Sequence, residues 1–191
     1  LSLSLEAAAA QHYAAMALWN LAQSTDHNNR VIAALLVGHL VSPAVPEAHK
    51  VRAASALSQL ADRRHLGADS ADPLTHKAAV VRAGGIEAMV RLLQEGEEER
   101  TKVAAVRALC GLVLRDATCQ DAVANAGAIA HLVELLKAAH TEEAKTAAAL
   151  ALWRVSERHA VNAAAVIVAG GEAPLRELSK TGVTVLARVA A

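Results

Sequence analysis

The sequence predicts an all-α solenoid, which is an elongated stack of helical repeats, and three observations support this prediction. One phrase recurs along the chain: VVRAGGIEAMVRLL at 80–93 returns as AVANAGAIAHLVELL at 122–136 and, in weaker form, as AVIVAGGEAPLREL at 165–178. The 191 residues are 54% hydrophobic but only 2% aromatic, and they are rich in Ala and Leu, the strongest helix formers. No segment sustains the alternation of apolar and polar residues that is typical of a strand.

Three glycines mark equivalent positions in successive repeats and so give the length of the repeat. Gly84, Gly127 and Gly170 hold the same place in the recurring phrase and follow one another at intervals of 43 residues. A period between about 40 and 47 residues is typical of stacked helical repeats. We expect these three glycines to form structural turns, because glycine adopts the left-handed conformation that ends a helix at no steric cost.

A second phrase marks another position of the repeat. It is found as ALWNL at 17–21, ALSQL at 56–60, ALCGL at 108–112 and ALWRV at 151–155. The last two copies are again 43 residues apart, whereas the earlier intervals differ. The irregularity is explained by a deletion in VIAALLVGHLV at 31–41, which has no Ala-Gly turn, and by an inserted polar loop at 65–76.

Each repeat is predicted to contain three helices, and residues 118–160 give the clearest copy. CQDAVANA is expected to form a short first helix that Gly127 ends, and AIAHLVELLKAA an amphipathic second helix. The third helix, TEEAKTAAALALWRVSER, begins with Thr141 as its N-cap. It has Arg154 and Arg158 near its C-terminus, the end that favours cations.

The predicted organisation is one elongated domain over residues 1–191, since each repeat contacts only its neighbours. It comprises a partial repeat (1–27), an irregular repeat with the inserted loop (28–73), two regular repeats (74–117 and 118–160) and a partial C-terminal repeat (161–191). The chain starts at Leu1 and its last repeat is short, so we expect a fragment of a longer protein. Its terminal segments LSLSLEAAAA and VTVLARVAA are apolar, which favours self-association through the ends or a continuation of the stack.

These phrases resemble armadillo repeats. The resemblance is carried by AGAIAHLVELL with AALALWRVSE, by AGGIEAMVRLL with AVRALCGLV, and by AAMALWNLA with NNRVIAA, and it covers nearly the whole chain. It implies a right-handed superhelix of helix triplets, in which the third helices line a concave groove that binds an extended peptide or a partner protein. The implied function is a non-enzymatic interaction scaffold of the vacuolar-anchor or plant type. An alternative is the substrate-binding accessory domain of a larger enzyme such as a ubiquitin ligase, and a weaker one is a nuclear-import adaptor.

The resemblance also implies which residues face the groove. In the import adaptors, successive third helices carry an Asn and, four residues before it, a Trp that sandwiches basic side chains by cation–π contacts. Here the Asn position holds Asn20, Gln59, Gly111 and Arg154, and the Trp position holds Met16, Ser55, Arg107 and Leu150. Only Asn20 fits that pattern, and two arginines would repel a basic import signal. The import-adaptor interpretation is therefore disfavoured.

Arg107 and Arg154 favour an acidic or phosphorylated ligand, because a guanidinium group grips carboxylate or phosphate with two hydrogen bonds. In the alternative interpretation, which is the more common arrangement, both arginines are solvated or pair with nearby carboxylates. The two tryptophans, Trp19 and Trp153, occupy one place in the third-helix phrase. They are either binding anchors or, more often for such a position, packing residues between repeats.

Little in the sequence points to catalysis, metal or cofactor binding. The nine histidines form no HxxxH or HExxH motif and fall mostly in loops or near helix ends, where they are expected to be solvated. Cys110 and Cys119 lack zinc-finger spacing; Cys110 is expected in the core and Cys119 nearer the surface. The acidic run EGEEER at 95–100 is expected to be a solvated loop before a third helix.

The remaining expectations concern partners and compartment. Nineteen basic residues balance nineteen acidic ones, which argues against a nucleic-acid footprint. The eleven-residue apolar run at 31–41 is too short to span a bilayer, so we expect no direct membrane insertion. Two unpaired cysteines fit a reducing compartment, which predicts a cytoplasmic location, with a nuclear or membrane-peripheral one left open to segments outside the chain.

Overall fold

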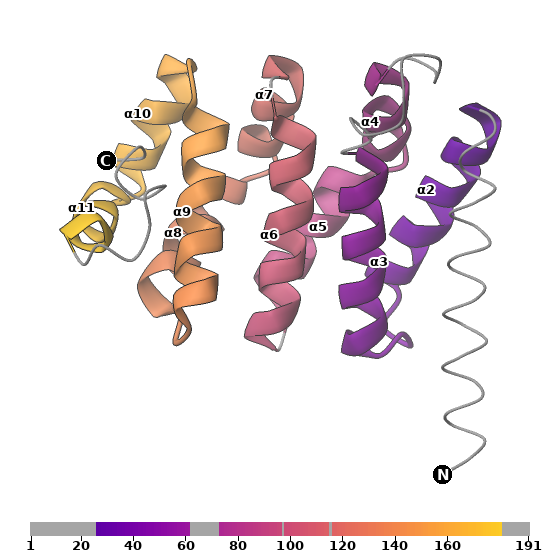
Figure 1. Cartoon of the computed structure of the whole chain (residues 1–191), viewed down its shortest axis with the longest axis horizontal. Helices are drawn as coiled ribbons and strands as arrows, with labels where there is room; N and C mark the ends of the chain where they lie inside the picture. Colours follow the sequence, from indigo (N-terminus) through magenta and orange to yellow (C-terminus); the bar gives the residue numbers. More distant parts are fainter. Residues whose placement is uncertain (1–25, 62–72, 97, 115, 181–191) are drawn as a thin grey trace, which may run out of the picture.

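The computed structural model describes residues 26–61, 73–96, 98–114 and 116–180, and within these ranges it contains helices and no strand. The helices follow one another as α2 (Asp26–Val41), α3 (Glu47–Ala61), α4 (Pro73–Arg82), α5 (Gly85–Glu95), α6 (Glu99–Val113), α7 (Ala117–Asn125), α8 (Ala128–Ala138), α9 (Glu142–Ser156), α10 (Ala160–Val168) and α11 (Glu172–Lys180). They stack in one direction as an all-α solenoid (Figure 1), which confirms the predicted fold class.

The stack is built from helix triplets. α4, α5 and α6 form one triplet, α7, α8 and α9 form the next, and α10 and α11 begin another. The third helices α3, α6 and α9 lie side by side across one face, where α3 packs on α6 and α6 packs on α9 (Figure 1). This continuous face of third helices is where the sequence places the groove. Met16 and Asn20, which were assigned to it, lie outside the described residues.

The triplet α7–α9 has the helices that the sequence predicts. α8 buries the apolar stripe expected of the second helix, and Thr141 is the N-cap of α9, where its hydroxyl accepts a hydrogen bond from the Ala144 amide at 3.3 Å. Arg158 differs from the prediction, because α9 ends at Ser156 and Arg158 lies outside it with a φ of 58°. A left-handed residue commonly follows the last turn of a helix, and Arg158 takes that position although it is not glycine.

The irregular repeat also differs from the sequence-based expectation. The polar loop predicted at 65–76 is shorter at its C-terminal end, because α4 already begins at Pro73. Proline is favoured in the first turn of a helix, since its missing N–H has no intrahelical partner there. Residues 62–72 lie outside the described ranges. Before them, α2 runs through 31–41 without a break, at the place where the other repeats have a glycine turn.

The recurring glycines make the turn between first and second helices. Gly84, Gly127 and Gly170 have φ values of 77°, 82° and 78°, all in the left-handed region that favours glycine. The second glycine of each Gly-Gly pair has a different role. A Cβ on Gly85 would lie 2.6 Å from Val80 Cγ1 and 2.7 Å from the Val80 carbonyl oxygen, so this position requires glycine for close packing.

The core runs the length of the described stack and is made of small and medium aliphatic side chains. Its largest repeated members are Leu57, Leu109 and Leu152, which are at most 1% exposed and come from the ALSQL, ALCGL and ALWRV phrases. They lie on α3, α6 and α9, so each third helix contributes the same leucine to the packing between repeats. Alanine-rich helices approach closely enough for this packing without aromatic side chains.

First helices also hold the ends of third helices. The Gln120 side chain of α7 donates hydrogen bonds from Nε2 to the carbonyl oxygens of Arg154 at 2.7 Å and Glu157 at 3.2 Å. Lys77 of α4 donates from Nζ to the Leu114 carbonyl at 2.7 Å. Because the last carbonyls of a helix have no partner within it, these bonds stabilise the C-terminal ends of α6 and α9.

A glutamate joins the N-termini of the third helices α6 and α9. The Glu99 carboxylate, at the start of α6, accepts hydrogen bonds from the amides of His140 at 2.8 Å and Thr141 at 3.1 Å, and from the Thr141 hydroxyl. The acidic run is therefore more than the solvated loop that was expected, since Glu99 ties α6 to the start of α9. Glu47, which begins α3, instead pairs within its own helix, where Oε1 lies 3.2 Å from Lys50 Nζ.

The Glu99 contact predicts a pH-dependent stability. The hydrogen bonds from the Thr141 side chain and then from the His140 amide hold the pKa of Glu99 below its usual value. A carboxyl with a lowered pKa in the folded state stabilises that state above the unfolded pKa of about 4.3, and this contribution is lost as the pH falls through the folded value. We expect Glu99→Gln to lower the midpoint of thermal unfolding at pH 7 and to have a shrinking effect as the pH falls toward 3.

A control variant separates this contact from general loss of charge. Glu177 is 71% exposed on α11 and pairs with the exposed Lys180, so Glu177→Gln should change the unfolding midpoint little at any of these pH values. A Glu99→Gln effect of constant size across the pH range would contradict the assignment.

Candidate ligand-binding groove

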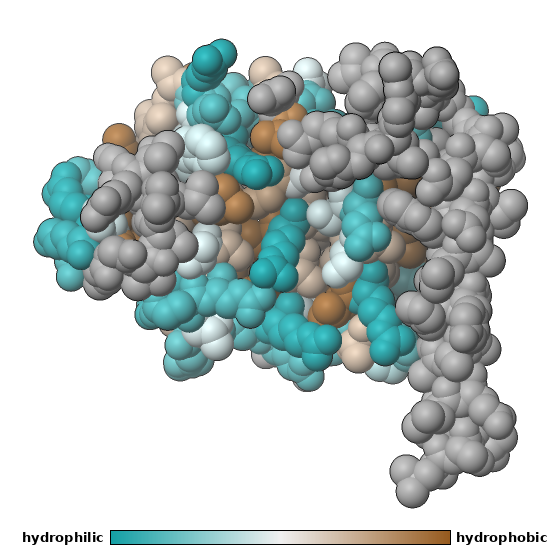
Figure 2. All heavy atoms as spheres, viewed as in Figure 1, coloured by the Kyte–Doolittle hydropathy of each residue, from teal (hydrophilic) through white to brown (hydrophobic). Residues whose placement is uncertain are grey.

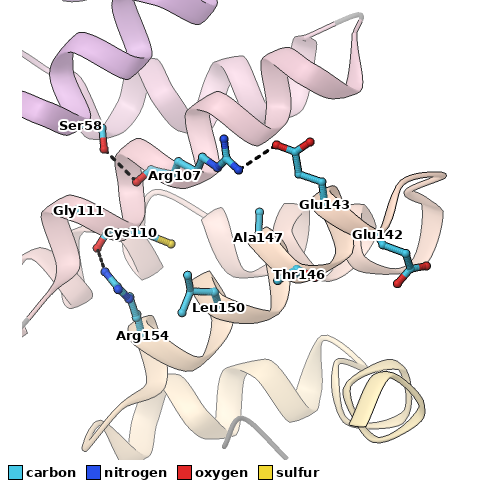
Figure 3. Close-up of a pocket in the computed structure, with 10 residues that line it drawn as sticks. All are labelled: Ser58, Arg107, Cys110, Gly111, Glu142, Glu143, Thr146, Ala147, Leu150 and Arg154. Atoms are coloured by element: carbon cyan, nitrogen blue, oxygen red, sulfur yellow. Dashed lines mark hydrogen bonds and ion pairs between the residues drawn. The ribbon is translucent and has the colours of Figure 1, made fainter. Parts of the chain in front are cut away.

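The face of third helices is hollowed between α6 and α9. The groove has a volume of about 460 Å³ and is lined by Ser58, Arg107, Cys110, Gly111, Glu142, Glu143, Thr146, Ala147, Leu150 and Arg154 (Figure 3). Hydrophilic and hydrophobic side chains are interspersed across this face (Figure 2). The groove is therefore amphipathic, because its lining combines apolar residues with polar and charged ones.

The groove contains part of the set that the sequence assigned to it. Arg107, Gly111, Leu150 and Arg154 line it. Ser55 and Gln59 of α3 are exposed on the neighbouring helix but are not among the lining residues. The Ser55 hydroxyl donates to the Val51 carbonyl of its own helix at 2.9 Å.

Sequence reasoning missed six lining residues, which are Ser58, Cys110, Glu142, Glu143, Thr146 and Ala147. Two of them carry a signal that could have identified them. Thr146 and Glu143 precede Leu150 by four and seven residues, which places them on the same face of one helix as Leu150. The expected set was taken only from the two positions that the import adaptors use, so residues nearer the N-terminus of α9 were left out.

Arg107 forms an ion pair across the groove. Its Nη2 lies 2.9 Å from Oε1 of Glu143, so the pair joins α6 to the first turn of α9 (Figure 3). Both side chains are more than 60% exposed. An exposed pair of this kind contributes about 0–1 kcal/mol to stability. Its main consequence for the groove is electrostatic, because the positive charge of Arg107 is already balanced.

Arg154 is held differently. Its Nη1 donates to the Cys110 carbonyl oxygen at 3.0 Å, and its Nε is buried without a hydrogen-bond partner among the described residues. The side chain is half-buried. From the sequence, the alternative to ligand binding was that both arginines are solvated or pair with nearby carboxylates. Arg107 does pair with a carboxylate, whereas Arg154 binds a backbone carbonyl.

The nearby Trp153 is half-buried on α9. It occupies the place in the third-helix phrase that Cys110 occupies in α6 and Ser58 in α3. Trp19 lies outside the described residues.

Both cysteines are unsuited to nucleophilic chemistry. Cys110 is buried, as expected, and desolvation raises the pKa of its thiol to about 12. Cys119 is also buried, at 5% exposed, which corrects the expectation of a more exposed residue. Its position on α7 turns it toward the core, and burial, with the adjacent Asp116, raises the pKa of Cys119 to about 12. Thiols with such pKa values stay protonated near neutral pH, and the thiolate is the reactive form.

The histidines also depart from the sequence-based expectation. His76 is only 3% exposed in α4, and His159 is the N-cap of α10, where Nδ1 accepts a hydrogen bond from the Asn162 amide. His159 Nε2 lies 2.8 Å from Asp121 Oδ1. These two histidines are therefore not the solvated side chains that the sequence led us to expect.

In the described part of the chain, no three His, Cys, Asp or Glu side chains gather as they would around a metal ion. No helix in this part is long and apolar enough to cross a bilayer.

Comparisons with known proteins agree with this architecture. Residues 75–113 match the family model described as Armadillo/beta-catenin-like repeat. The crystal structure of an engineered protein is similar to the chain with a TM-score of 0.74 and 28% identity, over 93% of this chain and 70% of that one. A designed armadillo repeat protein in complex with the peptide (KR)4 is similar with a TM-score of 0.70 and 20% identity, over 94% of this chain and 72% of that one.

A third similar structure is a computationally designed armadillo repeat protein for modular peptide recognition, with a TM-score of 0.71 and 21% identity over 94% of this chain and 74% of that one. None of the curated proteins compared with the chain matches its sequence. The family match covers most of α4 and all of α5 and α6, and α6 contributes Arg107, Cys110 and Gly111 to the groove. Residues 75–113 are thus similar to an armadillo repeat, and the all-α solenoid fold of the chain is similar to the fold of designed armadillo repeat proteins.

Proposed function

We propose that this chain is a non-enzymatic interaction module that binds an extended segment of a partner protein in the groove between α6 and α9. The observation that carries the proposal is the amphipathic groove on the third-helix face, which is lined by Arg107, Gly111, Leu150 and Arg154. The similar designed proteins described above support it, since one is in complex with a peptide and another was designed for peptide recognition.

The chemistry of the groove suits a peptide. Leu150 is partly buried against the core and gives an apolar contact surface, while Thr146 and Arg154 provide polar groups beside it. An extended peptide needs partners for its backbone groups and pockets for alternate side chains. A mixed lining of this kind can meet both needs.

The same positions support a finer assignment within the armadillo proteins. Gln59, Gly111 and Arg154 stand where the import adaptors have Asn, so we propose repeats of the vacuolar-anchor or plant type. Two buried, unpaired cysteines support a cytoplasmic location. We further propose self-association. The apolar ends at 1–10 and 183–191, to which the sequence assigned it, lie outside the described residues. Among the described residues, α10 exposes Val161, Ile167 and Val168 by 60% or more, and exposed apolar patches mark interaction sites.

The groove can be tested by filling it. Peptides selected from a random displayed library against the wild-type protein should bind about tenfold or more weakly to Thr146→Trp, because the indole would occupy the space between α6 and α9. The matched control is Arg91→Trp, which introduces the same ring at an exposed position of α5 outside the lining. Affinities can be measured by fluorescence anisotropy.

Either of two results would overturn the proposal. One is a selection that yields no peptide above background. The other is a set of peptides that bind Thr146→Trp and wild type with equal affinity.

A further inference from the structure

We propose that the groove recognises a partner segment that carries an aspartate or glutamate, that Arg154 binds this carboxylate, and that an apolar side chain two residues away contacts Leu150. The inference rests on the proposed function and adds the ligand class and its spacing. It depends on the distribution of charge in the groove, on the way Arg154 is held, and on the distance between Arg154 and Leu150.

The charges of the groove are balanced except at one place. Glu142 pairs with Lys145 at 2.9 Å, and Glu143 pairs with Arg107 at 2.9 Å. Arg154 has no carboxylate oxygen within 4.0 Å among the residues that the structure describes. A ligand that carries a positive charge would have to displace an existing ion pair. A ligand carboxylate can instead bind Arg154 without breaking one.

Arg154 is also positioned for an anion. The bond from Nη1 to the Cys110 carbonyl fixes one edge of the guanidinium group, so less side-chain freedom is lost when an anion binds. Arg154 is half-buried and lines the groove, so a carboxylate of the ligand can reach the part of its guanidinium group that faces the groove and accept a charge-assisted hydrogen bond there.

The spacing of the two contact residues sets the spacing in the ligand. Leu150 precedes Arg154 by four residues on α9, which corresponds to about one turn, or about 6 Å along the helix axis. In an extended peptide, two residues span about 6.6 Å and their side chains point to the same side. The expected motif therefore has an apolar residue and an acidic residue separated by one position, in either order.

The test uses fluorescein-labelled synthetic heptapeptides with randomised flanks and a Leu-Ala-Glu or Glu-Ala-Leu core. Matched sets replace the Glu by Gln or by Lys. With the wild-type protein, we expect the Glu peptides to bind about tenfold more tightly than the Gln peptides, and the preference to weaken as the salt concentration rises. In Arg154→Gln, the Glu and Gln peptides should bind equally.

A matched control removes the other groove arginine together with its partner. The double variant Arg107→Gln/Glu143→Gln loses one positive and one negative charge, so it should retain the preference for Glu. Arg154→Lys, which keeps the charge but lacks the planar fork, should retain part of it. If thermal unfolding shows that Arg154→Gln does not fold, Arg154→Lys and the salt dependence decide whether Arg154 binds the carboxylate of the peptide.

The outcomes separate the inference from the proposed function. Peptides that bind wild type without a preference for Glu, or that keep the preference in Arg154→Gln, would overturn the inference and leave a peptide-binding groove. Loss of the preference in the double variant would also overturn it, because Arg107 would then be the anion-binding residue. If no heptapeptide binds and the displayed library yields none, both proposals fail.

Discussion

Replacing Leu109 with alanine is expected to lower the free energy of unfolding by about 2–5 kcal/mol, the range typical of a buried leucine truncated to alanine. Leu109 is 1% exposed on α6, which packs against α3 on one side and α9 on the other. The missing atoms would leave a cavity at the junction of three repeats. In a solenoid each repeat is stabilised by its neighbours, so a defect in a central helix weakens both interfaces.

Urea denaturation followed by circular dichroism measures this loss. The matched control is Leu35→Ala on α2, where the leucine is 47% exposed and its truncation removes fewer buried contacts. Equal losses for the two variants would contradict the assignment of Leu109 to the inter-repeat core.

Replacing Gly85 with alanine is expected to cost about 1–3 kcal/mol, because the added methyl group would overpack the turn between α4 and α5. The new Cβ would lie 2.6 Å from Val80 Cγ1 and 2.7 Å from the Val80 carbonyl oxygen, distances that force the two helices apart. The equivalent residue of the next repeat is Ala128, which is fully buried. The next turn thus tolerates the methyl group that the Val80 contact excludes at Gly85.

Gly111→Ala is the control for this prediction. A Cβ at Gly111 would approach the backbone and hydroxyl oxygens of Ser58 no closer than 3.5 Å, which is ordinary van der Waals contact. Since alanine favours helix over glycine by about 0.5–1 kcal/mol, Gly111→Ala should leave stability unchanged or raise it. A Gly85→Ala variant with wild-type stability in the same denaturation experiment would refute the close-packing role.

The helices that the sequence predicts well are those where local signals and the repeat agree. Gly127 and Thr141 mark boundaries of α8 and α9 through backbone preferences that act within a few residues. Arg158 and Pro73 were placed wrongly, since helix ends depend on the neighbouring turn as much as on charge or polarity. The Glu99 contact could not be predicted, because its partners are 41 and 42 residues away.

The sequence alone determines that this protein is a stack of α-helices whose third helices present one face, because the 43-residue interval and the apolar spacing are local and repeated. It also places Arg107 and Arg154 on that face. It cannot distinguish between them, since a guanidinium group pairs with whichever acceptor lies within a few ångströms. Packing of α9 against α6 brings Glu143 to Arg107 and the Cys110 carbonyl to Arg154. The tertiary contacts thereby neutralise the first arginine and leave the charge of the second available to a ligand.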